Sequence, residues 1–144
     1  MKRSEFQKHP QVIDRLTIDA ISKVLEIEGR VIFAYLYGSM VAGEDGNDID
    51  IAIYSNADAS PHELSADVKV NLYKETGISP DRFDIRIVNT LVEQGDVFAL
   101  LYLRNVLQDG RIIVDKNLET RGDFLERYGL KFRECEGLMQ EVLA

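Results

Sequence analysis

The sequence contains a single cysteine, Cys135, among its 144 residues. One thiol cannot form a disulfide within the chain, and it cannot supply a thiolate-rich metal site. Every apolar run is far shorter than the roughly 20 residues that a membrane-spanning helix needs. The opening MKRSEFQKHP also lacks the apolar core of a secretory signal. We therefore expect a cytoplasmic protein that has no membrane partner.

Positive charge is also scarce. Seventeen Lys and Arg residues stand against 25 Asp and Glu residues, which gives a net charge of −8. A protein that grips long nucleic acid through its phosphates normally presents a basic stripe. The basic residues here are scattered, so we do not expect long DNA or RNA as a partner. A metal-bound nucleotide is compatible with this charge, because the cation offsets the repulsion.

The length and the apolar periodicity indicate one domain, residues 1–144, with a core at about 10–115 and a helical C-terminal segment at about 117–142. The predicted elements, in chain order, are a helix at 11–29, strands at 31–37 and 48–54, a helix at 60–77, a strand at 82–88, a helix at 91–108, a short extended piece at 109–115 and the C-terminal helix. The first two strands are close in sequence, so we expect a hairpin. The expected fold is of the α/β (α+β) class: a small mixed β-sheet with helices packed on it.

Three carboxylates fall at strand positions. Asp48 and Asp50 open the strand DIDIAIY, and their side chains project from one face because they are two residues apart. Asp84 interrupts the apolar strand FDIRIV, where an unpaired carboxylate is costly to bury. If these strands are neighbours, the three carboxylates meet. Such a set suits two Mg²⁺ ions, which prefer oxygen ligands and serve in-line phosphoryl transfer.

A glycine-serine turn precedes these carboxylates. Gly38 and Ser39 end the first strand in the stretch LYGSMVAGEDGNDIDIAIY. Glycine lets the backbone approach a phosphate, and successive backbone N–H groups in such a turn can form an anion-binding nest. We therefore predict that Gly38 and Ser39 bind nucleotide phosphates.

The order of strand, Gly-Ser, short loop, DID and later strand Asp resembles the signature of the DNA polymerase beta-like nucleotidyltransferase superfamily. Within it, AYLYGSMVAGEDGNDIDIAIY is most similar to the minimal nucleotidyltransferases (MNT proteins). The resemblance implies that Asp48 and Asp50 ligate two Mg²⁺ ions. It also implies that Asp84 ligates the catalytic ion and helps to deprotonate the attacking hydroxyl.

The same resemblance implies a function and a partner. Many MNT proteins are antitoxins of HEPN-domain ribonuclease toxins, and some inactivate the toxin by adding AMP to a tyrosine. The expectation is a Mg²⁺-dependent enzyme that transfers a nucleoside monophosphate, AMP from ATP, to a hydroxyl of a HEPN-type partner. The absence of a second substrate-enclosing domain after residue 115 also favours a large acceptor presented from outside.

Several alternatives stay open. The loop between Ser39 and Asp48 is a couple of residues shorter than the common family spacing, which favours an antitoxin that neutralises its partner by binding alone. A small-molecule nucleotidyltransferase of the antibiotic-modifying type is a further alternative, with a homo-oligomer completing its pocket. Asp84 has a structural alternative, an ion pair with Arg82 or Arg86, and Arg86 has the alternative role of steering phosphates. Tyr37, Tyr35 and Tyr102 are expected in the core, with base stacking as the alternative for Tyr37.

Overall fold

The computed structural model describes residues 14–38 and 48–143. Its elements are α2 (Arg15–Ile27), β1 (Val31–Tyr37), β2 (Ile49–Ser55), α4 (Pro61–Thr76), the 3₁₀ turn η1 (Pro80–Arg82), β3 (Phe83–Ile87), α5 (Leu91–Gln94), α6 (Val97–Asp109), β4 (Arg111–Asp115) and α7 (Leu118–Leu143). The four strands form one sheet in the order β3-β2-β1-β4. The predicted class, a small mixed sheet with helices packed on it and a C-terminal helix, is confirmed.

Strand pairing follows the sequence expectation. β1 and β2 are antiparallel neighbours, as the predicted hairpin requires, and β1 also pairs antiparallel with β4. β3 lies parallel to β2 on its other side. Parallel neighbours need a crossover connection, and α4 supplies it. The strand that carries Asp84 therefore lies directly beside the strand that carries Asp50.

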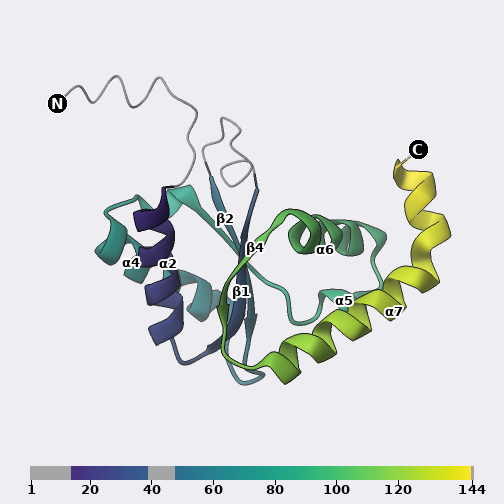
Figure 1. Cartoon of the computed structure of the whole chain (residues 1–144), viewed down its shortest axis with the longest axis horizontal. Helices are drawn as coiled ribbons and strands as arrows, with labels where there is room; N and C mark the ends of the chain where they lie inside the picture. The colour runs from purple at the N-terminus through teal and green to yellow at the C-terminus, as the bar shows by residue number, and fades with distance from the viewer. Residues whose placement is uncertain (1–13, 39–47, 144) are drawn as a thin grey trace.

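The sheet separates two layers of helices (Figure 1). On one face, α2 and α4 cover a core built from alternate strand residues such as Ile49, Ile51 and Ile53. On the other face, α5, α6 and α7 cover Phe33, Tyr35 and their neighbours. Because strand side chains alternate between faces, the residues between the isoleucines of β2 point toward the second layer.

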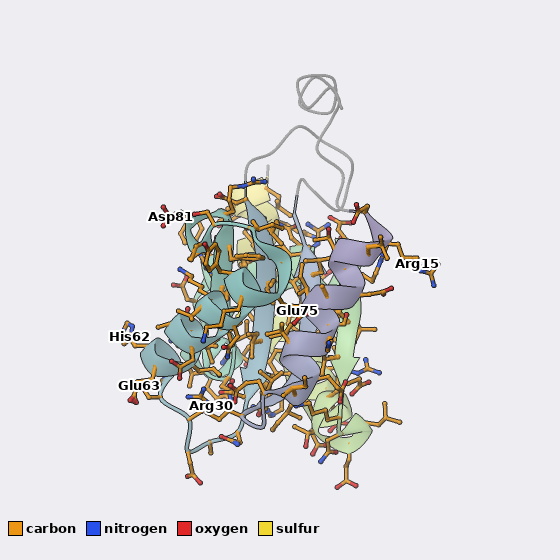
Figure 2. The ribbon with its side chains drawn as sticks, turned by 90° about the vertical axis from the view of Figure 1, so that its left-hand side faces the viewer. Arg15, Arg30, His62, Glu63, Glu75 and Asp81 are labelled. Atoms are coloured by element: carbon orange, nitrogen blue, oxygen red, sulfur yellow. The ribbon has the colours of Figure 1, made fainter. Side chains whose placement is uncertain are left out.

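Local capping explains where the helices of the first layer begin. The Asp14 carboxylate accepts a hydrogen bond of 2.8 Å from the backbone N–H of Thr17 and caps α2. Ser60 caps α4 as predicted, accepting from the backbone N–H of Glu63, and Pro61 occupies the first turn. Figure 2 looks onto this layer and shows His62 and Glu63 projecting outward from the start of α4. His62 is thus a surface residue, as expected.

Some sequence expectations are wrong in detail. The helix predicted at 91–108 is two helices, because Gly95 adopts a left-handed conformation (φ 65°) that ends α5 and Asp96 then caps α6. Leu138 is an apolar residue of the predicted C-terminal helix, yet its side chain is 57% exposed. The short helical stretch expected after Gly38 falls in 39–47, outside the described residues.

Within the described residues, the structure has no helix that is both long and apolar enough to cross a membrane.

Candidate functional site

Asp50 and Asp84 lie opposite each other on adjacent strands. The β2–β3 register pairs Asp50 with Asp84 directly, and β1 pairs Tyr37 with Asp50 on the other side. The two carboxylates are on the sheet face that α6 covers, because the alternate residues Ile49 and Ile51 fill the opposite core. Alternation in the sequence predicts which face of its own strand each aspartate occupies. The parallel pairing of β2 with β3 puts both aspartates side by side on the same face of the sheet.

The environment of Asp50 disfavours its ionised form. Burial, followed by the negative charges of Asp84 and Asp48, raises the pKa of the Asp50 carboxyl to about 6. Like charges held this close either share a proton or bind a cation. The guanidinium of Arg86 acts in the opposite direction and lowers that pKa. The cluster therefore has the electrostatic character of a cation-binding site.

Gly38 lies against this cluster. Its φ is +99°, and a Cβ atom built on it would lie 2.0 Å from Oδ2 of Asp50. No side chain fits there, so the end of β1 approaches the carboxylate closely only because residue 38 is glycine. The structure thus brings Gly38 beside Asp50, as the phosphate-binding prediction needs. Ser39, its predicted partner, falls outside the described residues.

The fit of a metal ion rests on two of the three predicted ligands. Asp50 and Asp84 face each other, whereas Asp48 is exposed just before β2 and affects Asp50 through its charge. Across residues 14–38 and 48–143, no group of three or more His, Cys, Asp or Glu side chains is gathered as a metal site. The oxygen chemistry and the mutual repulsion of Asp50 and Asp84 fit a hard cation such as Mg²⁺.

A pair of tyrosines and an arginine complete the cluster. The hydroxyl groups of Tyr37 and Tyr102 are 2.7 Å apart in a hydrogen bond. The guanidinium carbon of Arg86 lies 4.5 Å from the centre of the Tyr102 ring. Burial raises the pKa of Tyr102 to about 12 and raises that of Tyr37 further, and the charges of Asp50 and Asp84 contribute in the same direction.

The tyrosine pair shows what sequence reasoning missed, whereas Arg86 was already a candidate for steering phosphates. Tyr37 and Tyr102 were expected in the core, but both are only half-buried. Arg86 offered a signal, since it lies two residues from Asp84 on the same strand face. Tyr102 gave none, because its neighbours in α6 form an almost continuous apolar run. Of the ion pairs between described residues, none joins Asp84 to Arg86. The alternative pairing of Asp84 with Arg82 stays a prediction.

Comparison with known families identifies the fold. The model of the family described as "Polymerase beta, Nucleotidyltransferase" matches residues 19–119. The chain belongs to this nucleotidyltransferase family. The matched region runs from α2 into the start of α7 and contains Gly38, Asp48, Asp50 and Asp84. A search of curated proteins gives no match.

Solved structures agree at the level of the fold. One similar chain comes from the complex of a tri-AMPylated Shewanella oneidensis HEPN toxin with MNT antitoxin, at 19% identity and a TM-score of 0.54, covering 92% of this chain and all of the other. Another is from a toxin–antitoxin crystal structure with AMP-PNP, at 20% identity and a TM-score of 0.55, covering 88% and 98%. The polymerase beta-like nucleotidyltransferase fold that the sequence resemblance implied is thereby confirmed, and the chain is similar in fold to these toxin–antitoxin chains.

Proposed function

We propose that this protein transfers AMP from Mg²⁺-bound ATP to a hydroxyl group of a HEPN-type toxin and acts as the antitoxin of that pair. The observation that carries the proposal is the direct pairing of Asp50 with Asp84 beside the Gly38 turn in a nucleotidyltransferase fold. Similar solved structures suggest the partner class, since one is a complex of a tri-AMPylated HEPN toxin with MNT antitoxin and another is a toxin–antitoxin with AMP-PNP. Both act in the cytoplasm in this proposal.

In the proposed reaction, the three carboxylates bind metal and one of them also accepts a proton. Asp48, Asp50 and Asp84 would hold Mg²⁺, which neutralises phosphate charge when it is bound. The acceptor hydroxyl oxygen bonds to the α-phosphorus, and the bond from that phosphorus to the bridging oxygen of the β-phosphate breaks. The electron pair leaves with pyrophosphate, and Asp84 helps to take up the hydroxyl proton. Backbone N–H groups at Gly38 and Ser39 bind the phosphates.

Label transfer tests this proposal. The protein is incubated with Mg²⁺, ATP labelled at the α-phosphate and a HEPN-domain protein, and labelled toxin is followed by gel and mass spectrometry. We expect one AMP added for each modified hydroxyl, with no transfer by Asp50→Asn. Asp58→Asn is a matched control, because Asp58 is an exposed carboxylate beyond the other end of β2. Equal transfer by Asp50→Asn and wild type would refute the assignment of Asp50.

The alternatives give different results when a cell-protection assay and labelling of an aminoglycoside are added to this experiment. If the antitoxin acts by binding alone, the Asp48→Ala/Asp50→Ala double variant protects cells as well as wild type does. In that case neither protein labels the toxin. A small-molecule enzyme labels an aminoglycoside or a similar hydroxyl compound and leaves the toxin unmodified. Toxin labelling that depends on Asp50 excludes both.

A further inference from the structure

Arg86 is a cation that the fold places near the carboxylate pair, and its charge acts on Asp50. It follows Asp84 by two residues on β3, so both side chains project from one face of the strand. In the β2–β3 register Arg86 lies opposite Ala52, next to the pairing of Asp50 with Asp84. Ala52 is itself buried in the core of this face, so Arg86 stands at the border between that core and the carboxylate pair. Arg86 itself is exposed, and a ligand can reach it.

Within residues 14–38 and 48–143, the guanidinium of Arg86 contacts an aromatic ring and forms no ion pair with a carboxylate. Its carbon lies 4.5 Å from the centre of the Tyr102 ring, the distance of a cation–π contact. A guanidinium group has five N–H donors. A contact with the face of a ring leaves these donors able to bind an anion. Arg86 therefore keeps its charge and its donors for another anion, although two carboxylates are nearby.

Tyr102 is in turn held by a hydrogen bond with Tyr37 of β1. Its hydroxyl is 2.7 Å from that of Tyr37, and the two rings meet edge to face with centroids 5.6 Å apart. Tyr37 is the last residue of β1 and pairs with Asp50. The tyrosine pair thus connects β1 through α6 to the arginine on β3, around the two carboxylates.

We propose that Arg86 binds the phosphates of ATP beyond the α-phosphate, and that the Tyr37–Tyr102 pair positions its guanidinium. This inference rests on the proposed function, in which Asp50 and Asp84 act at the α-phosphate. Arginine suits this task because its planar fork matches two phosphate oxygens at once. It stabilises the negative charge that accumulates on departing pyrophosphate.

Nucleotide binding separates this role from a structural one. Affinities for ATP and for AMP are measured by calorimetry with Mg²⁺ on wild type, Arg86→Gln and Arg86→Lys. We expect Arg86→Gln to weaken ATP binding by about ten- to a hundredfold, the range of a charged hydrogen bond, and to change AMP binding less than twofold. Arg86→Lys is intermediate because it keeps the charge but not the fork. Arg104→Gln, on α6 in the groove against α7, is the control.

A double-mutant cycle tests the positioning role of the tyrosine pair. Tyr102→Leu removes the ring, and Tyr102→Phe removes only the hydroxyl that contacts Tyr37. We expect Tyr102→Leu to weaken ATP binding about fivefold or more, but to have no further effect when Arg86 is already Gln. Tyr102→Phe has the smaller effect. Thermal unfolding confirms that each variant is folded.

The outcomes are distinguishable. If wild type does not bind Mg²⁺-ATP, the proposed function fails and this inference fails with it. If wild type binds ATP and Arg86→Gln binds it equally well, only the role of Arg86 is overturned. Equal losses for ATP and AMP also overturn it, because they place Arg86 at the nucleoside or the α-phosphate. Additive effects of Arg86→Gln and Tyr102→Leu exclude positioning by Tyr102.

Discussion

The two faces of the sheet differ sharply, and β2 shows the difference within seven residues. Ile49, Ile51 and Ile53 are at most 1% exposed and fill the core beneath α2 and α4. Between them, Asp50 points to the other face, where a carboxyl with a pKa of about 6 meets Asp84. One strand therefore supplies stability on one side and chemistry on the other. Substitutions of Ile49, Ile51 or Ile53 should therefore affect stability, whereas a substitution of Asp50 should affect activity.

The largest expected effect is on activity, at Asp50. Asp50→Asn keeps the shape of the side chain but removes the charge that the metal and the phosphates require. We expect AMP transfer to fall by at least about a thousandfold. The thermal midpoint of the metal-free protein should equal or exceed that of wild type, since one of two repelling carboxylates is gone. A drop in that midpoint comparable to that of a core variant would show that the two faces are not separable.

The next effect is on stability, at the adjacent position. Ile51→Ala removes a side chain that is fully buried between the sheet and its helices. We expect it to reduce the free energy of unfolding by about 2–5 kcal/mol, the usual cost of such a cavity. Urea unfolding measures this loss. ATP affinity of the protein that remains folded should match wild type, and a tenfold loss there would contradict the separation of the faces.

Much of this arrangement could be predicted from the sequence because alternation is a local signal. The sequence DIDIAIY sends the isoleucines to one side and the aspartates to the other whatever the rest of the chain does. The pairing of Asp50 with Asp84 needed one further step, the parallel placement of β3, which the crossover by α4 favours. These steps lead from the sequence to the fold and to the carboxylate pair.

The remainder depends on contacts that no local pattern records. Tyr102 lies in an apolar helix, and its contact with Arg86 joins residues from α6 and β3. The break between α5 and α6 depends on the left-handed conformation of Gly95, which an isolated glycine in a helix-like pattern does not by itself reveal. The closeness of Gly38 to Asp50 appears only once β1 and β2 are paired.

A smaller effect is expected where the two regions meet, at Gly38. An alanine there would adopt φ +99° and place its Cβ 2.0 Å from Asp50 Oδ2. We expect Gly38→Ala to lower the free energy of unfolding by about 1–3 kcal/mol through backbone strain and to weaken Mg²⁺-ATP binding at the same time. Calorimetry and urea unfolding measure the two effects.

Gly122→Ala is the matched control for that variant. A Cβ at Gly122 meets nothing within 4 Å, and the position lies inside α7. Alanine favours a helix over glycine by about 1 kcal/mol, so this variant should be more stable than wild type and bind ATP equally well. If Gly38→Ala also left both properties unchanged, the close contact of Gly38 with Asp50 would have no functional role.

The smallest expected effect concerns an ion pair at the far end of α2, away from the carboxylates. The Glu28 carboxylate accepts hydrogen bonds from the Arg30 side chain at 2.8 and 2.9 Å, and Arg30 also reaches Asp67 of α4 at 3.0 Å (Figure 2 shows Arg30 below α4). The hydrogen bonds from Arg30 to Glu28 lower the pKa of the Glu28 carboxyl to about 2. A carboxyl whose pKa is lower in the folded state stabilises the protein at neutral pH.

The sign of that shift fixes the pH range of the effect. The contribution of Glu28 is complete above pH 4.5, its ordinary pKa, and is lost as the pH falls toward 2. We expect Glu28→Gln to lower the free energy of unfolding by about 1 kcal/mol at pH 7, because solvent screens the partly exposed Arg30. The difference from wild type in urea unfolding should shrink below pH 4.5. AMP transfer at pH 7 should be unchanged, and a loss of transfer in the folded variant would show that the α2–α4 face also supports the chemistry on the opposite face.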